Sequence, residues 1–126
     1  MSSSSSSSTK YDWLVVVPDK PGKQADRLKV RAQHFEGIRP LAEAGFLKTG
    51  GAIFNDIPEG TDASKYDFYG SSLVCVAESK EEVLEVLKKD IYATSGVWDL
   101  ENAQIWPPMT AEEGTVFILA IIVTTP

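Results

Sequence analysis

Four strand-like segments alternate with two helical segments, and this order restricts the fold more than any other feature of the sequence. The strand-like segments are rich in β-branched and aromatic residues and end at turn residues. They are residues 11–18, 47–55, 69–77 and 98–106, and the helical segments are residues 24–44 and 80–89. The order of elements is therefore βαββαβ, with a loop at residues 56–67 and a short irregular turn at residues 90–96.

A chain with this order is expected to form a ferredoxin-like α+β domain. Its antiparallel four-stranded sheet carries both helices on one face, and the first strand is expected to be central. The other face then needs cover, which a second copy of the chain supplies economically. The sequence therefore predicts a homodimer that buries the sheet face lined by Trp13, Val15 and Leu73.

Local signals set the expected helix boundaries. Gly45 ends the first helix, and Pro40 inside it removes a backbone donor, which predicts a kink over residues 36–40. Ser79 followed three residues later by Glu82 forms a capping box, which predicts that the second helix begins at residue 80.

The two ends of the chain differ in composition from its middle. Residues 1–10 form a serine-rich leader that we expect to be disordered, and residues 11–108 form the domain. Residues 109–126 are a C-terminal extension whose apolar run, residues 116–123, is too short to span a bilayer. We expect this run to pair as an extra strand along a sheet edge.

The charge balance and the rarity of histidine and cysteine exclude several classes of function. The chain has 12 basic and 18 acidic residues, which argues against binding to nucleic acid or to an anionic membrane. One histidine and one cysteine cannot build an ordinary zinc site, and no glycine-rich phosphate loop is present. We expect a cytoplasmic protein that binds a small molecule without a metal or cofactor, with Cys75 as a buried apolar residue.

Four motifs together resemble a known family. These are RLKVRAQHFEGIRPLAEAGFLKTGGAIFND, YGSSLVCVAES, the DIY of residues 90–92 and the GVW of residues 96–98. The ordered pattern of R-x-x-H, a glycine near the second strand, G-S on the third and D-x-Y after the second helix is similar to the YciI-like, or YCII-related, family. That family is a group of dimeric α+β barrels related in fold to muconolactone isomerases. The resemblance covers residues 11–107.

The resemblance implies an active-site pair formed by His34 and Asp90. Some members of the family act in elimination or dechlorination of lactone-like or hydroxylated aromatic breakdown products, which implies a lyase or isomerase. The sequence departs from the usual D-P-[FY] pattern, because Ile91 stands where the family has proline.

The chemistry of the histidine side chain agrees with this role. An imidazole can take up and return a proton within one catalytic cycle at neutral pH. A carboxylate bonded to its other nitrogen, the role assigned to Asp90, would fix the tautomer and stabilise the charged form. The alternative for His34 is a partly buried helix residue whose polar atoms are satisfied by a neighbour.

Further candidates for ligand binding surround this pair. Arg31 lies one helical turn before His34 and is either an anion clamp or a solvated surface residue. Ser71 could bind a ligand oxygen, while Gly50, next to Gly51, either allows close approach of a ligand or marks a bulge. Tyr92 is expected in the core or in the wall of a pocket.

Two functions therefore remain open. The first is a cofactor-independent lyase or isomerase that transfers a proton on a small lactone, enol or hydroxylated aromatic-derived substrate. The second is a non-catalytic module, a small-molecule-binding or accessory subunit, because a fold does not determine chemistry.

Overall fold

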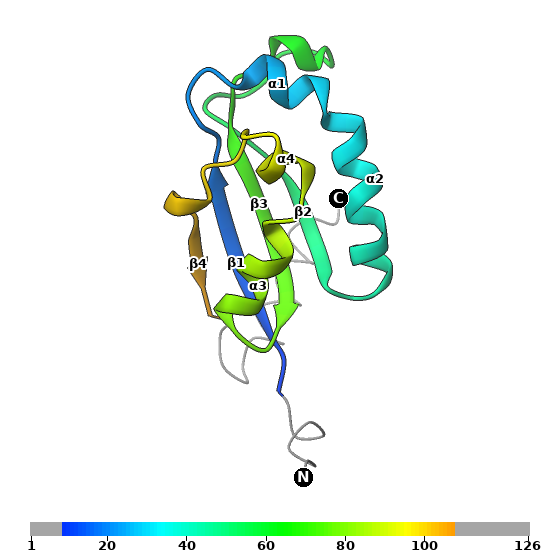
Figure 1. Cartoon of the computed structure of the whole chain (residues 1–126). Helices are drawn as coiled ribbons and strands as arrows, with labels where there is room; N and C mark the ends of the chain where they lie inside the picture. Colours follow the sequence, from blue (N-terminus) through cyan, green and yellow to red (C-terminus); the bar gives the residue numbers. More distant parts are fainter. Residues whose placement is uncertain (1–8, 108–126) are drawn as a thin grey trace, which may run out of the picture.

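The chain forms one antiparallel sheet with its helices on a single face (Figure 1). The structure is a computed structural model that describes residues 9–107. The serine-rich leader, apart from its last two residues, and the predicted strand at residues 116–123 lie outside the described residues. The elements, in chain order, are β1 (Tyr11–Pro18), α1 (Gln24–Lys29), α2 (Arg31–Glu43), β2 (Leu47–Phe54), η2 (Ala63–Lys65), β3 (Phe68–Ala77), α3 (Lys80–Leu87), α4 (Ile91–Thr94), η3 (Leu100–Asn102) and β4 (Gln104–Trp106).

The order of the strands across the sheet is β2-β3-β1-β4, and every neighbouring pair is antiparallel. Strand β1 pairs with β3 along its whole length, from Tyr11 opposite Ala77 to Pro18 opposite Gly70. It pairs with β4 on its other side and is therefore central, as predicted. This arrangement confirms the ferredoxin-like α+β class.

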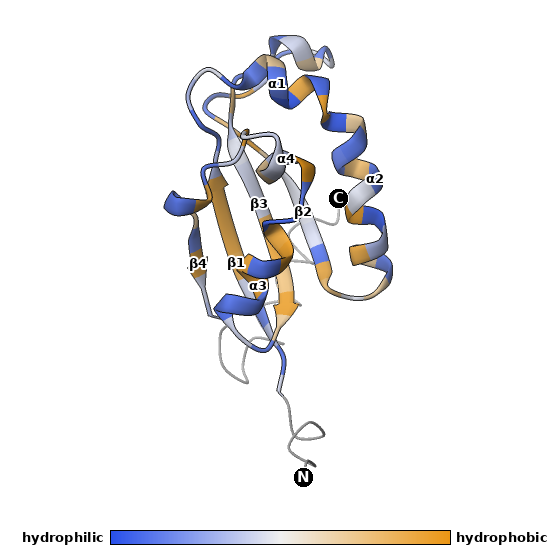
Figure 2. Ribbon diagram, viewed as in Figure 1, coloured by the Kyte–Doolittle hydropathy of each residue, from blue (hydrophilic) through white to orange (hydrophobic). Residues whose placement is uncertain are grey.

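Alternation along the central strands sorts their side chains between the two faces. Val15 and Val17 of β1 are completely buried under the helices. Leu14, which directly precedes Val15, points to the other face and is 45% exposed. On β3 the buried helix-side residues are Ser71, Leu73, Cys75 and Ala77. Figure 2 shows β1 as the most apolar strand of the sheet and helices that carry both hydrophobic and hydrophilic residues. Each buried valine contributes roughly 1.5–3 kcal/mol to the stability of this core.

The open face of the sheet carries different residues from those that the sequence predicted. Val15 and Leu73 lie in the helix-covered core, and Trp13 packs against that core while its Nε1 donates to Ala77 O at 2.9 Å. Because neighbouring residues of a strand point to opposite faces, the assignment was wrong by one residue. The apolar residues on the open face include Leu14, Val16, Val74, Val76 and Trp106.

The first helical segment is divided at Val30, and helix α2 continues through Pro40, so the predicted kink over residues 36–40 stays a prediction. Val30 has φ −103° and ψ 9°, outside the helical range, and separates α1 from α2. Backbone hydrogen bonds continue on both sides, because Val30 N donates to Asp26 O and His34 N donates to Val30 O. Pro40 removes one backbone hydrogen bond, and α2 absorbs this loss near its end.

The last predicted strand is much shorter than expected. Strand β4 covers only residues 104–106, and Trp98 forms an isolated bridge with Asp19 before the η3 turn. Residues 91–94 form helix α4 where an irregular turn was expected, because Asp90 caps its N-terminus. Among residues 9–107, no helix is long and apolar enough to cross a membrane.

Ser79 caps α3 as predicted, although the Glu82 carboxylate accepts from Glu78 N rather than from Ser79 N, and the cap generates a test of the fold. Ser79 Oγ accepts from Glu82 N at 3.1 Å. Replacing Ser79 with alanine removes this acceptor, so we expect the free energy of unfolding to fall by about 1 kcal/mol. Urea denaturation measures this change. Ser79→Thr, which keeps a capping oxygen, is the control, and an equal loss in both variants would contradict the capping role.

Candidate functional site

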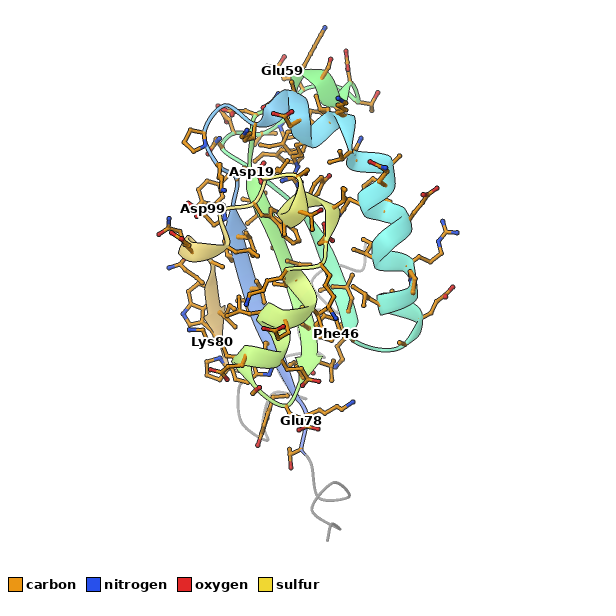
Figure 3. The ribbon with its side chains drawn as sticks, viewed as in Figure 1. Asp19, Phe46, Glu59, Glu78, Lys80 and Asp99 are labelled. Atoms are coloured by element: carbon orange, nitrogen blue, oxygen red, sulfur yellow. The ribbon has the colours of Figure 1, made fainter. Side chains whose placement is uncertain are left out.

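A buried arginine joins the end of β1 to the helices above the sheet. Arg27 on α1 is only 3% exposed, and its Nη1 donates to Asp19 Oδ1 at 2.8 Å and to Oδ2 at 2.9 Å. Figure 3 marks Asp19 beyond the end of β1. Burial raises the pKa of the Asp19 carboxyl, although the charge of Arg27 opposes this shift.

The guanidinium group of Arg27 also organises the residues beside it. Its Cζ lies 4.7 Å from the ring centroids of both Phe68 and Tyr92, and its Nη2 donates to Ser71 Oγ at 3.0 Å. Such contacts favour a cation that is shielded from water. The Nε atom of Arg27 is buried without a hydrogen-bond partner in the described part of the chain.

Sequence analysis did not identify Arg27 or Asp19. Arg27 precedes His34 by seven residues, which is about two helical turns, so the helical period places the two side chains on one face. That spacing was a usable signal. Asp19 followed a proline in a predicted turn, and nothing local distinguished it from other turn residues.

His34 and Asp90 are brought together although 56 residues separate them in the chain. His34 Nδ1 lies 2.9 Å from Asp90 Oδ1, and both side chains are almost completely buried. The same carboxylate oxygen caps α4 by accepting from Tyr92 N at 2.8 Å. A carboxylate can only accept, so in contact with an Asp90 carboxylate the imidazole carries a proton on Nδ1. In the neutral imidazole with this tautomer, Nε2 keeps its lone pair.

Aromatic rings fix the plane of the imidazole. The ring of Tyr92 stacks on His34 with centroids 4.0 Å apart and an interplanar angle of 17°, and Trp98 meets His34 edge-on. Tyr92 is 2% exposed, and this burial raises the pKa of its hydroxyl. Tyr92 therefore acts as a neutral wall of the site.

A cavity of about 300 Å³ lies between α2 and the sheet and contains most of the predicted site residues in its wall. Those residues are Arg31, His34, Gly50, Ser71 and Tyr92, and the cavity is also lined by Arg27, Phe35, Phe54 and Phe68. Asp90 does not line it. Asp90 lies behind His34 and faces a neighbouring apolar cavity of about 390 Å³, which also reaches Phe46 at the far end of the sheet (Figure 3).

Arg31 and Gly50 line the cavity, and the structure bears on the alternatives that the sequence left open for each. Arg31 is half-buried over the ring of Phe35 at 5.2 Å, and it forms no ion pair within residues 9–107. Gly50 pairs regularly with Leu73, and the register shifts of β2 lie at Leu47/Thr49 and Ile53/Phe54, so the predicted bulge is not at the glycines. A Cβ on Gly50 would meet its nearest neighbour at 3.6 Å and would fit.

Gly70 places Ser71 at the floor of this cavity. A Cβ on Gly70 would overlap Val17 O and lie 2.8 Å from Pro18 Cα, so only glycine permits this close approach of β3 to β1. Ser71 follows it on the helix side of β3, where its Oγ also accepts from Trp98 Nε1 at 3.1 Å.

Two other features of the site region limit its chemistry. Burial raises the pKa of the Cys75 thiol to about 12, so this residue stays protonated and unreactive. Within residues 9–107, no three side chains of histidine, cysteine, aspartate or glutamate come close enough to hold a metal ion.

Comparison with known proteins identifies a family and several relatives. The model of the YCII-related domain matches residues 12–107. Fusaric acid biosynthesis protein 2 of Gibberella fujikuroi is 33% identical over 97 residues, which cover 76% of this chain and 90% of that protein. Aspartate kinase FUB3 of Fusarium oxysporum f. sp. lycopersici is 34% identical over 97 residues, but these span only 17% of its length.

One solved structure is similar in fold. It is a 5-chloro-2-hydroxyhydroquinone dehydrochlorinase from Burkholderia phenoliruptrix AC1100 in complex with 2,5-dihydroxybenzoquinone. The TM-score is 0.65 with 24% sequence identity, and the alignment covers 81% of this chain and 97% of that one. At this level of identity the likeness concerns the fold.

The buried ion pair generates a stability prediction. Asp19→Asn leaves the charge of Arg27 without a counterion, so we expect the free energy of unfolding to fall by roughly 3 kcal/mol. Chemical denaturation measures the loss. Asp99→Asn is the matched control, because Asp99 accepts only an exposed hydrogen bond from Asn102 and its variant should lose less than about 1 kcal/mol. Equal losses in the two variants would contradict a special role for the buried pair.

Proposed function

The chain belongs to the YCII-related domain family, and on that premise we propose that it is a small cofactor-independent enzyme of the lyase or isomerase type. Its substrate is a small lactone, enol or hydroxylated aromatic-derived molecule. The observation that carries the proposal is the buried His34–Asp90 hydrogen bond, with His34 in the wall of a cavity of about 300 Å³.

His34 acts as the general base and acid. His34 donates from Nδ1 to the Asp90 carboxylate, so the lone pair of Nε2 is available to a substrate. The carboxylate also stabilises the imidazolium that forms when Nε2 takes up a proton. Tyr92 stacked on the ring prevents it from turning away. This supports proton transfer in a fixed direction, because a catalytic base must be held in place.

Arg31 binds the negative charge that develops on the substrate. Its guanidinium group lines the cavity one helical turn from His34 and has no carboxylate partner in the described part of the chain. Arg27 is less suited to this task, because Asp19 already neutralises it. A single uncompensated cation favours an anionic ligand such as an enolate.

The reaction follows from these positions. His34 Nε2 removes a proton from a carbon next to a carbonyl group, and the electron pair moves to the carbonyl oxygen. Returning the proton to another carbon gives an isomerase, and loss of a leaving group gives a lyase. The dehydrochlorinase of similar fold acts on a chlorinated hydroxyhydroquinone, which supports the second course.

The alternative is a non-catalytic small-molecule-binding or accessory subunit. One observation favours it, because the relative aspartate kinase contains a matching stretch that makes up only 17% of its length. In such a protein the domain would hold a ligand or position another part. The absence of any turnover with a well-bound ligand would support this alternative.

We also propose that two copies of the chain pair through the open face of the sheet. Leu14 lies opposite Val74 on one side and Trp106 on the other, which forms a continuous apolar patch. Leu14 is 45% exposed and Trp106 43% exposed in the single chain. Because water-exposed apolar patches are unfavourable, a second copy is the economical cover. The compartment we propose is the cytoplasm, since the lone Cys75 is a buried free thiol.

The base role of His34 is tested by its glutamine variant. We expect His34→Gln to lower kcat/KM by ~10²- to 10⁴-fold, because the variant cannot take up the proton. Release of chloride from 5-chloro-2-hydroxyhydroquinone and deuterium incorporation from D₂O into carbonyl substrates are the measurements. Glu36→Gln, an exposed change on the same helix, is the control and should leave the rate unchanged. A rate for His34→Gln within a few-fold of the parent would remove His34 from the mechanism.

The open face is tested by placing a charge at its centre. Leu14→Lys should convert the dimer to a monomer, because it would bury an unpaired ammonium group between the two sheets. Light scattering gives the mass. Ala32→Lys adds the same charge on the exposed side of α2 and should leave the dimer intact. A parent protein that is monomeric at micromolar concentration would overturn the proposed pairing.

A further inference from the structure

The hydroxyl group of Ser71 has a restricted set of hydrogen-bond roles. Arg27 Nη2 lies 3.0 Å and Trp98 Nε1 lies 3.1 Å from Ser71 Oγ. Guanidinium and indole nitrogens can only donate. The serine oxygen therefore accepts twice, and both of its lone pairs are occupied.

The remaining capacity of Ser71 is its own O–H. A hydroxyl group has one hydrogen and two lone pairs, so a serine that accepts twice can only donate further. Among residues 9–107 the structure contains no hydrogen bond in which Ser71 Oγ is the donor. Ser71 is 4% exposed and lines the cavity beside His34, so its hydrogen is left for whatever occupies that cavity.

A second donor near Ser71 is also unpaired. Arg27 Nε is completely buried and has no partner among the described residues. A buried donor without a partner costs about 1–3 kcal/mol. Two donor groups, the Ser71 hydroxyl and Arg27 Nε, therefore lie together beside the cavity without an acceptor from the described residues, and Arg27 Nη2 holds Ser71 Oγ from the buried side.

We propose that Ser71 is a fixed hydrogen-bond donor that selects ligands carrying an oxygen without a hydrogen, namely a carbonyl oxygen or the enolate oxygen derived from it. Arg27 and Trp98 are positioning residues that act through Ser71. The inference rests on the proposed function and narrows its substrates, because a ligand that presents only hydroxyl groups there would place a donor against a donor.

The arrangement also assigns a step to Ser71. When His34 Nε2 takes the proton from carbon, the C–H electron pair forms the C=C bond of the enolate and the carbonyl electron pair moves onto the oxygen. Ser71 donates to that oxygen as its charge increases. In an elimination the oxygen pair then re-forms the C=O bond, the C=C pair moves to form a double bond to the carbon that carries the leaving group, and that group departs with its bonding electrons. A donor held in place beforehand stabilises such a charge without reorganisation.

Binding of 2,5-dihydroxybenzoquinone tests the donor role without any turnover. At neutral pH its ionised form carries oxygens without hydrogens. We expect Ser71→Ala to raise Kd by about 10- to 100-fold, because one hydrogen bond to a charged acceptor is lost. Spectrophotometric titration measures Kd. Ser71→Thr keeps the hydroxyl group and should regain most of the affinity.

The control for this titration is Ser64→Ala. It removes a serine hydroxyl that bonds only to exposed Asp62, far from the cavity lining, and should leave Kd unchanged. The proposal is overturned if Ser71→Ala binds within two-fold of the parent or if the parent does not bind the quinone at millimolar concentration.

The positioning role of Trp98 is tested by a ratio of affinities. Trp98→Phe releases one lone pair of Ser71 Oγ, so the serine can then accept from hydroquinone, whose oxygens carry hydrogens. We expect the preference for the quinone over hydroquinone to fall several-fold. A general loss of stability would lower the affinities for both ligands together and leave the ratio of the two Kd values unchanged. An unchanged ratio would therefore contradict the positioning role of Trp98.

These measurements separate the two proposals. If His34→Gln abolishes turnover while Ser71→Ala leaves Kd unchanged, the donor assignment fails and the proposed function remains. If Ser71→Ala weakens binding while His34→Gln does not affect turnover, the binding site remains and the catalytic role of His34 fails.

Discussion

The buried charge of Arg27 is the constraint on which the rest of the site depends. A guanidinium group removed from water needs a counterion and further acceptors, and the chain supplies Asp19 and Ser71 for this purpose. Two aromatic rings, Phe68 and Tyr92, cover its faces. The end of β1, the first helix, β3 and α4 therefore meet at one side chain, and the cavity between them keeps its shape because this centre cannot be rearranged without exposing or stranding a charge.

The buried contacts also determine how hydrogen-bond donors and acceptors are oriented at the site. His34 and Ser71 each contact a neighbour that plays only one hydrogen-bonding role, a carboxylate that accepts or an indole N–H that donates. The Asp90 carboxylate accepts a hydrogen bond and so determines which nitrogen of His34 carries a proton. Trp98 donates to Ser71 Oγ and so leaves the serine hydrogen, rather than a lone pair, for a ligand. In the mechanism proposed above, the cavity presents His34 Nε2 as an acceptor on one wall and the Ser71 hydroxyl as a donor on another. Shape alone would permit a ligand to bind in several orientations, whereas this polarity favours one.

The sequence predicted the ferredoxin-like fold because hydrophobic periodicity, the glycine stop at Gly45 and the capping box at Ser79 are local signals. It failed where distant residues determine local structure. The last strand is short because the η3 turn separates the bridge at Trp98 from strand β4. The open face was misassigned because a shift of one residue exchanges the faces of a strand. The His34–Asp90 pairing followed from family resemblance, whereas the contact between Arg27 and Asp19 depends on the tertiary fold.

The double use of Asp90 has a consequence for how this site can change during evolution. One carboxylate oxygen both holds the imidazole of His34 and caps the four-residue helix that carries Tyr92. A substitution at this position that removes the carboxylate oxygen therefore takes away the partner of the histidine and weakens the start of the helix that carries the stacked ring in a single event. A lineage that abandons the chemistry is expected to remodel residues 90–98 as a block, while one that retains it keeps the aspartate even where the following residue varies, as Ile91 illustrates.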